Sequence, residues 1–170
     1  MLFKRKAKEE ASLEGGARDP TPEGAALLHD EFGLHQLWYL EVRLKEELAR
    51  AARADGIFSI ACWRLRLLPG EEPDPELLRQ AAQLIGGRLR TYDVCARIDN
   101  ERFVALLLEA DHNNASTVAF RLKADLQVQI TASGRWQAGV ATFPRDGVDG
   151  DTLIQAAFRR LDEDARAGAA

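Results

Sequence analysis

Cysteine is scarce in this sequence, and the little there is fits neither a metal site nor a disulfide framework. The 170 residues include two cysteines, Cys62 and Cys95, and each lies inside an apolar segment. Neither their number nor their spacing is that of a zinc site or of a disulfide-rich secreted domain. We therefore predict that both thiols are small core side chains in a protein of a reducing compartment, the cytoplasm.

The sequence also lacks an excess of positive charge and any long apolar run. It has 23 lysines and arginines against 27 aspartates and glutamates, a net charge of -4. Proteins that bind nucleic acid usually carry a basic face, so nucleic acid is not an expected partner. No stretch approaches the roughly 18 apolar residues that cross a bilayer, and residues 1–8 lack the apolar region of a signal peptide. No membrane span is therefore expected.

Histidine is rare as well. His29, His35 and His112 stand apart in the sequence, and no nucleophile lies at a spacing that would favour a catalytic pair. We interpret the three rings as solvated or helix-capping side chains.

What the sequence does have is enough apolar residues for one core. A hydrophobic content of 46% in 170 residues predicts one domain. Residues 1–24 mix basic residues with glycine and proline and show no apolar periodicity. Such a segment buries too little apolar surface to fold, so we predict a flexible basic tail followed by a domain over residues 25–170. The basic residues leave open a contact of the tail with an anionic membrane surface.

The apolar pattern after the tail alternates between helix and strand periodicity. Leucines at three- and four-residue spacing predict a helix over residues 30–54, and Asp74 followed by Pro75 predicts the start of another. Alternating side chains predict a strand over residues 57–67. The other predicted elements are strands at 94–98 and 103–108, a helix capped by Asn113 or Asn114, a short strand at 128–130, a strand at 135–143 and a helix at 151–165. This order predicts an α+β sandwich, with helices packed on a mostly antiparallel sheet.

The segment from Arg90 to Leu108 predicts a β-hairpin with a polar tip between two apolar runs. Its outline is Arg-x-x-Asp, a five-residue strand, a five-residue signature and an apolar strand, which resembles the GGDEF family of diguanylate cyclases. Similar segments at 33–34, 74–78 and 137–144 extend the resemblance over residues 30–167. The resemblance implies the sandwich fold of nucleotidyl cyclases. Its signature positions are filled here by Asp99, Asn100, Glu101, Arg102 and Phe103.

At these positions the sequence departs from the family pattern, and from the departure we predict a degenerate domain, a pseudoenzyme. The resemblance places the family's metal-binding carboxylates at Arg64 and Arg66, and two cations would repel a divalent metal. The signature glycines are replaced by larger polar residues, and Glu101 is interpreted as an exposed ion pair with Arg102. We therefore expect no catalytic residue, no metal and no cofactor. The negative charge of Asp99 at a glycine position also argues against GTP or ATP as an allosteric ligand, because it would repel the phosphates.

Arg90 and Asp93 keep the place and spacing of the family's inhibitory site for cyclic di-GMP, and Arg121 falls at the position of its second arginine. Arginine can donate two hydrogen bonds to guanine O6 and N7, and a carboxylate can accept from N1 and N2. The resemblance therefore implies that these three residues bind cyclic di-GMP. The same residues also fit an ordinary corner between a helix and a strand. If they bind the ligand, replacing Arg90 or Asp93 is expected to weaken binding and to leave stability nearly unchanged.

Two functions remain open from the sequence. One is a catalytically inactive receptor for cyclic di-GMP that signals to a protein partner in a bacterial cytoplasm. The other is a ligand-independent scaffold for protein–protein interaction within a motility, polarity or secretion assembly. The residues identify no partner, and they leave open a homodimer.

Overall fold

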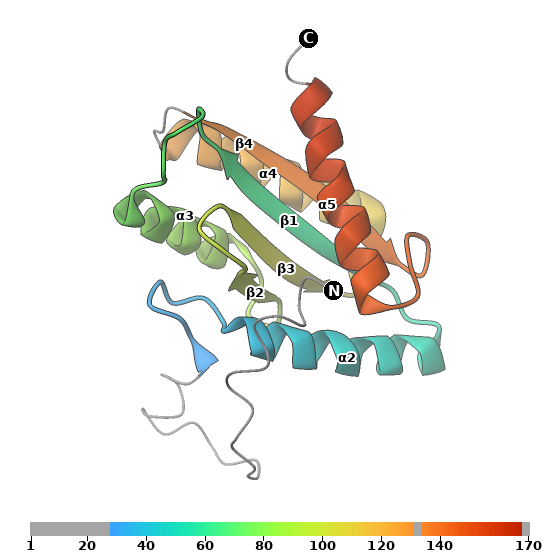
Figure 1. Cartoon of the computed structure of the whole chain (residues 1–170). Helices are drawn as coiled ribbons and strands as arrows, with labels where there is room; N and C mark the ends of the chain where they lie inside the picture. The colour runs from blue at the N-terminus through green and yellow to red at the C-terminus, as the bar shows by residue number, and fades with distance from the viewer. Residues whose placement is uncertain (1–27, 131–133, 168–170) are drawn as a thin grey trace.

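The computed structural model describes residues 28–130 and 134–167 (Figure 1). The elements are α2 Leu37–Ala54, β1 Phe58–Arg66, α3 Pro75–Arg88, β2 Val94–Arg97, β3 Arg102–Leu108, α4 His112–Gln129, β4 Arg135–Phe143 and α5 Gly150–Ala167. The predicted flexible tail at 1–24 lies outside the described residues. Among the helices of the described ranges, none is long and apolar enough to cross a membrane.

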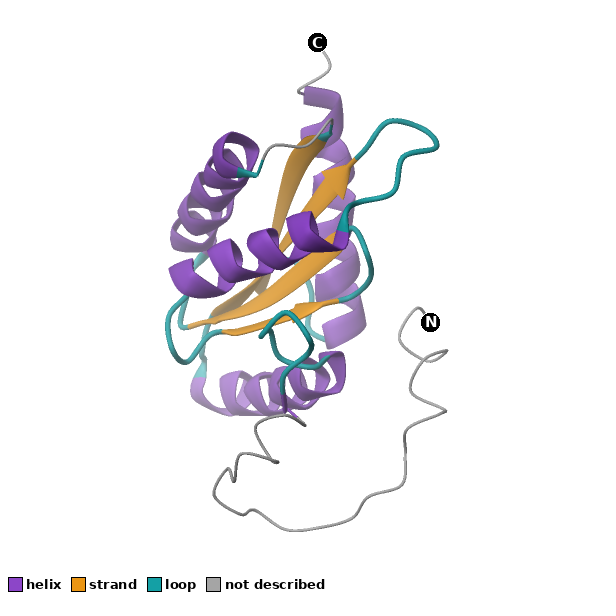
Figure 2. Cartoon of the chain, turned by 90° about the vertical axis from the view of Figure 1, so that its left-hand side faces the viewer, coloured by secondary structure: helices purple, strands orange, loops and turns teal. Residues whose placement is uncertain are grey.

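The four strands form one antiparallel sheet in the order β2-β3-β1-β4. Helices α3 and α4 cover one face of the sheet, and α2 and α5 cover the other, so the elements form three layers (Figures 1 and 2). One buried apolar cluster fills each space between helices and sheet. The predicted α+β sandwich is therefore confirmed.

Strand β1 lies between β3 and β4 and is buried on both faces. Ala61 and Trp63 face α3 and α4, whereas Phe58 and Ile60 face α2 and α5. This is the predicted alternation, and a strand covered on both faces needs apolar residues at nearly every position. Trp63 also donates its indole Nε1–H to the carbonyl of Ala119 at 2.9 Å, which holds α4 against the sheet.

The two cysteines are core residues, as their apolar surroundings predicted. Cys62 and Cys95 are free thiols, and both are buried. Burial raises the pKa of each thiol, because the thiolate would lose its hydration. Both groups therefore stay protonated and act as small apolar side chains.

Helix α2 begins later than predicted, at Leu37 and not at Asp30. The carboxylate of Asp30 accepts the backbone N–H groups of Phe32 at 2.9 Å and Leu34 at 3.0 Å, which closes a turn. Gly33 in this turn has a φ of 82°, a left-handed conformation that glycine adopts at low cost. The hydrogen bonds of the Asp30 side chain thus stabilise a turn in place of the first turns of the predicted helix.

Helix α4 differs from the prediction at both ends. Its N-cap is Asp111, whose carboxylate accepts the backbone N–H of Asn114 at 2.7 Å. The predicted caps, Asn113 and Asn114, therefore lie inside the helix. The predicted strand at 128–130 is wrong, because α4 continues to Gln129. At this end Leu126 and Ile130, four residues apart, are buried, whereas Val128 points to solvent, as expected for helical and not strand spacing.

Helix α5 packs closely on β4 at Gly139. A Cβ atom at this position would overlap the carbonyl oxygen of Ala157 and crowd the backbone nitrogen of Leu161. Any side chain would therefore push α5 away from the sheet. The close contact depends on the absence of a side chain at this residue.

Candidate functional site

The corner between α3 and β2 carries Arg90 and Asp93, two of the three residues predicted to bind a ligand. The carboxylate of Asp93 accepts the backbone N–H of Arg90 at 3.0 Å and that of Leu108, on β3, at 3.2 Å. Asp93 is 8% exposed, and this burial raises the pKa of its carboxyl group although both N–H groups act in the opposite direction. Asp93 therefore ties the corner to the neighbouring strand.

Arg90 lies exposed on the same corner. Its Nη1 donates to the hydroxyl of Tyr92 at 2.9 Å, and its guanidinium carbon lies 5.7 Å from the centre of the Tyr92 ring. Within residues 28–130 and 134–167, Arg90 forms no ion pair with a carboxylate. Most of its five N–H donors are therefore available to a ligand.

Arg121 is exposed on the neighbouring helix, α4. One turn further along α4, Asp125 forms an ion pair with Arg88 at the end of α3, with 3.6 Å between Nη2 and Oδ2. Because Arg88 precedes Arg90 by two residues, this contact brings the end of α3 to the part of α4 that carries Arg121. In the described part of the chain, no hydrogen bond or ion pair joins Arg121 to Arg90 or Asp93. The structure thus places two predicted residues in one corner and the third on the adjacent helix.

The tip of the β2–β3 hairpin is ordered by Asp99. Its Oδ1 accepts the backbone N–H groups of Glu101 and Arg102, both at 2.9 Å, and its Oδ2 accepts Nε of Arg102 at 2.7 Å. Partial burial raises the pKa of Asp99, but the bonds from Arg102 and Glu101 outweigh it and hold the pKa below its usual value. The predicted ion pair of Glu101 with Arg102 is therefore wrong, because Arg102 pairs with Asp99. Phe103, the last signature position, is buried in the core.

Arg64 connects three elements. Its Nε and Nη2 donate to Oε1 of Gln137 on β4 at 2.8 and 2.6 Å, and Nη2 pairs with Oδ1 of Asp162 on α5 at 2.8 Å. Arg66, two residues further along β1, is exposed. Over the described ranges, no three or more histidine, cysteine, aspartate or glutamate side chains form a group that could hold a metal ion.

The loop before α2 brings two of the histidines together. The rings of His29 and His35 have centres 4.9 Å apart, and His35 stacks on Tyr39 at 5.1 Å. Burial and the nearby His29 lower the pKa of His35, although its Nδ1 lies 3.3 Å from the carbonyl oxygen of Cys95. The interpretation of His35 as a solvated or capping residue is therefore wrong.

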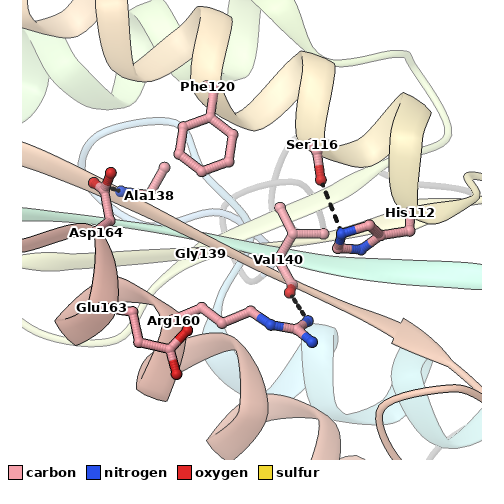
Figure 3. A pocket seen from close by; sticks show the side chains of 9 residues that line it. All are labelled: His112, Ser116, Phe120, Ala138, Gly139, Val140, Arg160, Glu163 and Asp164. Carbon is pink, nitrogen blue, oxygen red and sulfur yellow. Dashed lines mark hydrogen bonds between the residues drawn. The ribbon is translucent and has the colours of Figure 1, made fainter. Parts of the chain in front are cut away.

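A hollow of about 350 Å³ lies where β4 passes between α4 and α5 (Figure 3). It is lined by His112, Ser116, Phe120, Ala138, Gly139, Val140, Arg160, Glu163 and Asp164. His112 lies at the rim of the hollow. Its pKa is lowered mainly by burial and also by the nearby positive charge of Arg145. Sequence reasoning missed this hollow, because its residues come from three elements and share no spacing that could have revealed it.

The sequence profile described as "Diguanylate cyclase, GGDEF domain" matches residues 70–170. No curated protein matches the sequence. Among solved structures, the GGDEF domain of TpbB (YfiN) from Pseudomonas aeruginosa is similar, with a TM-score of 0.71 and 22% identity over 82% of this chain and 89% of that one. These comparisons agree with the sheet order and the layers described above.

Two further solved structures have the same fold. The diguanylate cyclase SiaD from Pseudomonas aeruginosa, in complex with its activator SiaC, gives a TM-score of 0.71 and 22% identity over 86% of this chain and 61% of that one. The GGDEF domain of DgcB from Caulobacter crescentus, in complex with cyclic di-GMP, gives 0.70 and 15% over 91% and 95%. At these identities the likeness establishes the fold.

The family match corrects the prediction that the chain is not an enzyme. That prediction is wrong, because the matching family is that of the diguanylate cyclases. It relied on the residue types at Arg64 and Arg66, where the resemblance placed the metal-binding carboxylates, and on the replaced glycines of the signature. The residue type alone does not show which opposite charge lies nearby in the folded chain. The positive charge of Arg64 is paired with the carboxylate of Asp162.

Proposed function

Since the chain belongs to the GGDEF family of diguanylate cyclases, we propose that it is a receptor for cyclic di-GMP that passes the signal to a protein partner. The ligand would bind at Arg90, Asp93 and Arg121. The observation that carries the proposal is the exposed guanidinium of Arg90, which has no carboxylate partner within the described ranges. Arg90 follows Arg88 by two residues, and Arg88 pairs with Asp125 on α4, the helix that carries Arg121. The complex of DgcB, a protein of the same fold, with cyclic di-GMP supports this choice of ligand.

The chemistry of the three side chains suits a guanine dinucleotide. The planar donors of Arg90 match the O6 and N7 acceptors of guanine, and a second arginine adds a charge-assisted contact. Both oxygens of Asp93 already accept backbone N–H groups, but each carboxylate oxygen has a second lone pair. We assign Asp93 two tasks: it fixes the corner that presents Arg90, and it accepts from guanine N1 or N2.

Calorimetric titration of the whole chain with cyclic di-GMP tests the proposal. Loss of a bidentate contact to guanine costs about 1–3 kcal/mol, so Arg90→Ala is expected to bind about fivefold to 150-fold more weakly. Arg121→Ala is expected to weaken binding as well, and the difference should shrink at high salt.

The matched control is Arg79→Ala. Arg79 lies in the second turn of α3, pairs with Glu76 at the surface, and carries the same charge as Arg90. This variant should bind like the wild type. No binding by the wild type at high micromolar ligand would refute the receptor proposal. Equal loss of affinity in all three variants would show that positive charge in general, and not this site, determines binding.

The alternative, a ligand-independent scaffold, is favoured by one specific observation. Trp38 and Val42 lie one turn apart on α2 and are 45% and 42% exposed, so together they present an apolar surface that a protein partner could cover. If titration finds no ligand, Trp38→Ala is expected to reduce capture of a protein partner while Arg90→Ala leaves it unchanged. The opposite result would disfavour the scaffold.

A further inference from the structure

Strand β4 is an edge of the described sheet, so one side of its backbone faces no other strand there. The residues on that side recur at every second position: Trp136, Ala138, Val140 and Thr142. The N–H and C=O groups of an edge strand are a template on which another chain can add a strand. Whether these N–H and C=O groups already have hydrogen-bond partners therefore decides whether another chain can add a strand to the sheet.

At the beginning of β4, side chains from both flanking helices accept hydrogen bonds from the outward backbone N–H groups. The N–H of Trp136 donates to Oε1 of Gln127, on α4, at 2.9 Å. The N–H of Ala138 donates to Oδ2 of Asp164, on α5, at 3.1 Å. Lys123 of α4 also binds this carboxylate, with Nζ 2.7 and 2.8 Å from its two oxygens.

The second half of β4 is occupied in the same way. The carbonyl of Val140 accepts from Nη1 of Arg160, on α5 (Figure 3). The N–H of Thr142 donates to Oδ2 of Asp146 at 2.8 Å, and the carbonyl of Thr142 accepts the backbone N–H of Asp146 at 2.8 Å. Arg160 also pairs with Asp146, at 2.9 and 2.8 Å, so the two side chains hold each other in place.

The other edge of the sheet is covered differently. There the loop before α2 lies along β2, and the backbone N–H of His35 donates to the carbonyl of Cys95 at 2.9 Å. Main chain thus covers β2, whereas the edge of β4 is bonded mostly by side chains, with the backbone of Asp146 added at Thr142. The hollow of about 350 Å³ beside Ala138 to Val140 is the space through which an added strand would approach, and Arg160 and Asp164 line it (Figure 3).

We propose that Gln127, Asp146, Arg160 and Asp164 form an edge cap that prevents a second copy of this chain from adding a strand to β4. Each cap residue occupies a backbone group that an incoming strand would need. Removing one acceptor leaves an unpaired N–H, which the backbone of another molecule can satisfy. The cap therefore keeps the β4 edge from self-association, independently of any ligand.

The pair Asp164→Ala and Asp164→Asn tests the cap, because both remove the same charge and only the second keeps an acceptor oxygen for the N–H of Ala138. Sedimentation velocity over a wide range of protein concentration measures self-association. Asp164→Ala is expected to associate about tenfold more tightly than Asp164→Asn and the wild type. If the two variants associate equally, or if Asp164→Ala stays as monomeric as the wild type, the cap proposal is overturned.

Amide hydrogen exchange on the wild-type monomer gives a second readout that needs no variant to fold. The N–H groups of Trp136, Ala138 and Thr142 are expected to exchange slowly although they lie on an edge strand, because each has an acceptor. Exchange at the rate of open amides would overturn the proposal. In associated Asp164→Ala, new protection must appear along β4, and protection confined to another face would also overturn it.

Discussion

Replacing Asp93 with alanine tests whether its carboxylate holds the corner between α3 and β2. The side chain accepts two backbone N–H groups, from Arg90 and Leu108, and is 8% exposed. A buried backbone donor left without a partner costs about 1–3 kcal/mol, and two are lost here. Relief from burying the carboxylate offsets part of this cost, so we expect Asp93→Ala to be destabilised by about 2–4 kcal/mol. This reverses the expectation from the sequence that the substitution leaves stability nearly unchanged.

Urea and thermal unfolding, followed by tryptophan fluorescence, measure the effect. A change of about 2–4 kcal/mol corresponds to a fall in melting temperature of roughly 4–16 °C in a chain of this size. Asp93→Asn keeps one acceptor oxygen and should lie between alanine and wild type. Arg90→Ala removes an exposed side chain and should stay within about 0.5 kcal/mol of wild type. If Asp93→Ala unfolds at the wild-type midpoint with an unchanged slope, the carboxylate does not hold the corner.

Two further predictions concern the core and the loop before α2. Trp63→Phe should lower the free energy of unfolding by about 2 kcal/mol, because it loses the hydrogen bond to Ala119 and leaves a small cavity. Trp136→Phe should cost less, because the buried Nε1 of Trp136 has no partner in the described residues. Equal losses in chemical unfolding would contradict the role of the hydrogen bond. Because the pKa of His35 is lowered in the folded protein, the unfolded chain binds the proton more readily, and stability should fall as the pH drops below about 6.5. His35→Phe should flatten this dependence between about pH 7 and pH 5, and an unchanged slope of the urea midpoint against pH would assign it to other groups.

Local patterns in the sequence are enough to predict the class of fold and the features that repeat along the chain. The alternation along β1 follows from the two-residue period of a strand, and the start of α3 follows from Asp74 and Pro75. Where several polar residues compete for one cap, sequence reasoning chose wrongly. Asp111 caps α4 instead of Asn113 or Asn114, and which side chain reaches the first free N–H groups depends on the path of the chain into the helix.

Which side chains already hold a hydrogen bond or an ion pair follows from contacts that form when distant segments pack together. The carboxylate of Asp93 is bound to a strand fifteen residues away in sequence, and Arg64 is balanced by Asp162, ninety-eight residues away. Hydrogen bonds and ion pairs act over a few ångströms of space, and no local pattern records a partner that the sheet brings close. The same reason explains why the edge cap of β4 is invisible in the sequence: its residues come from α4, α5 and a turn, and they meet only because β4 passes between them.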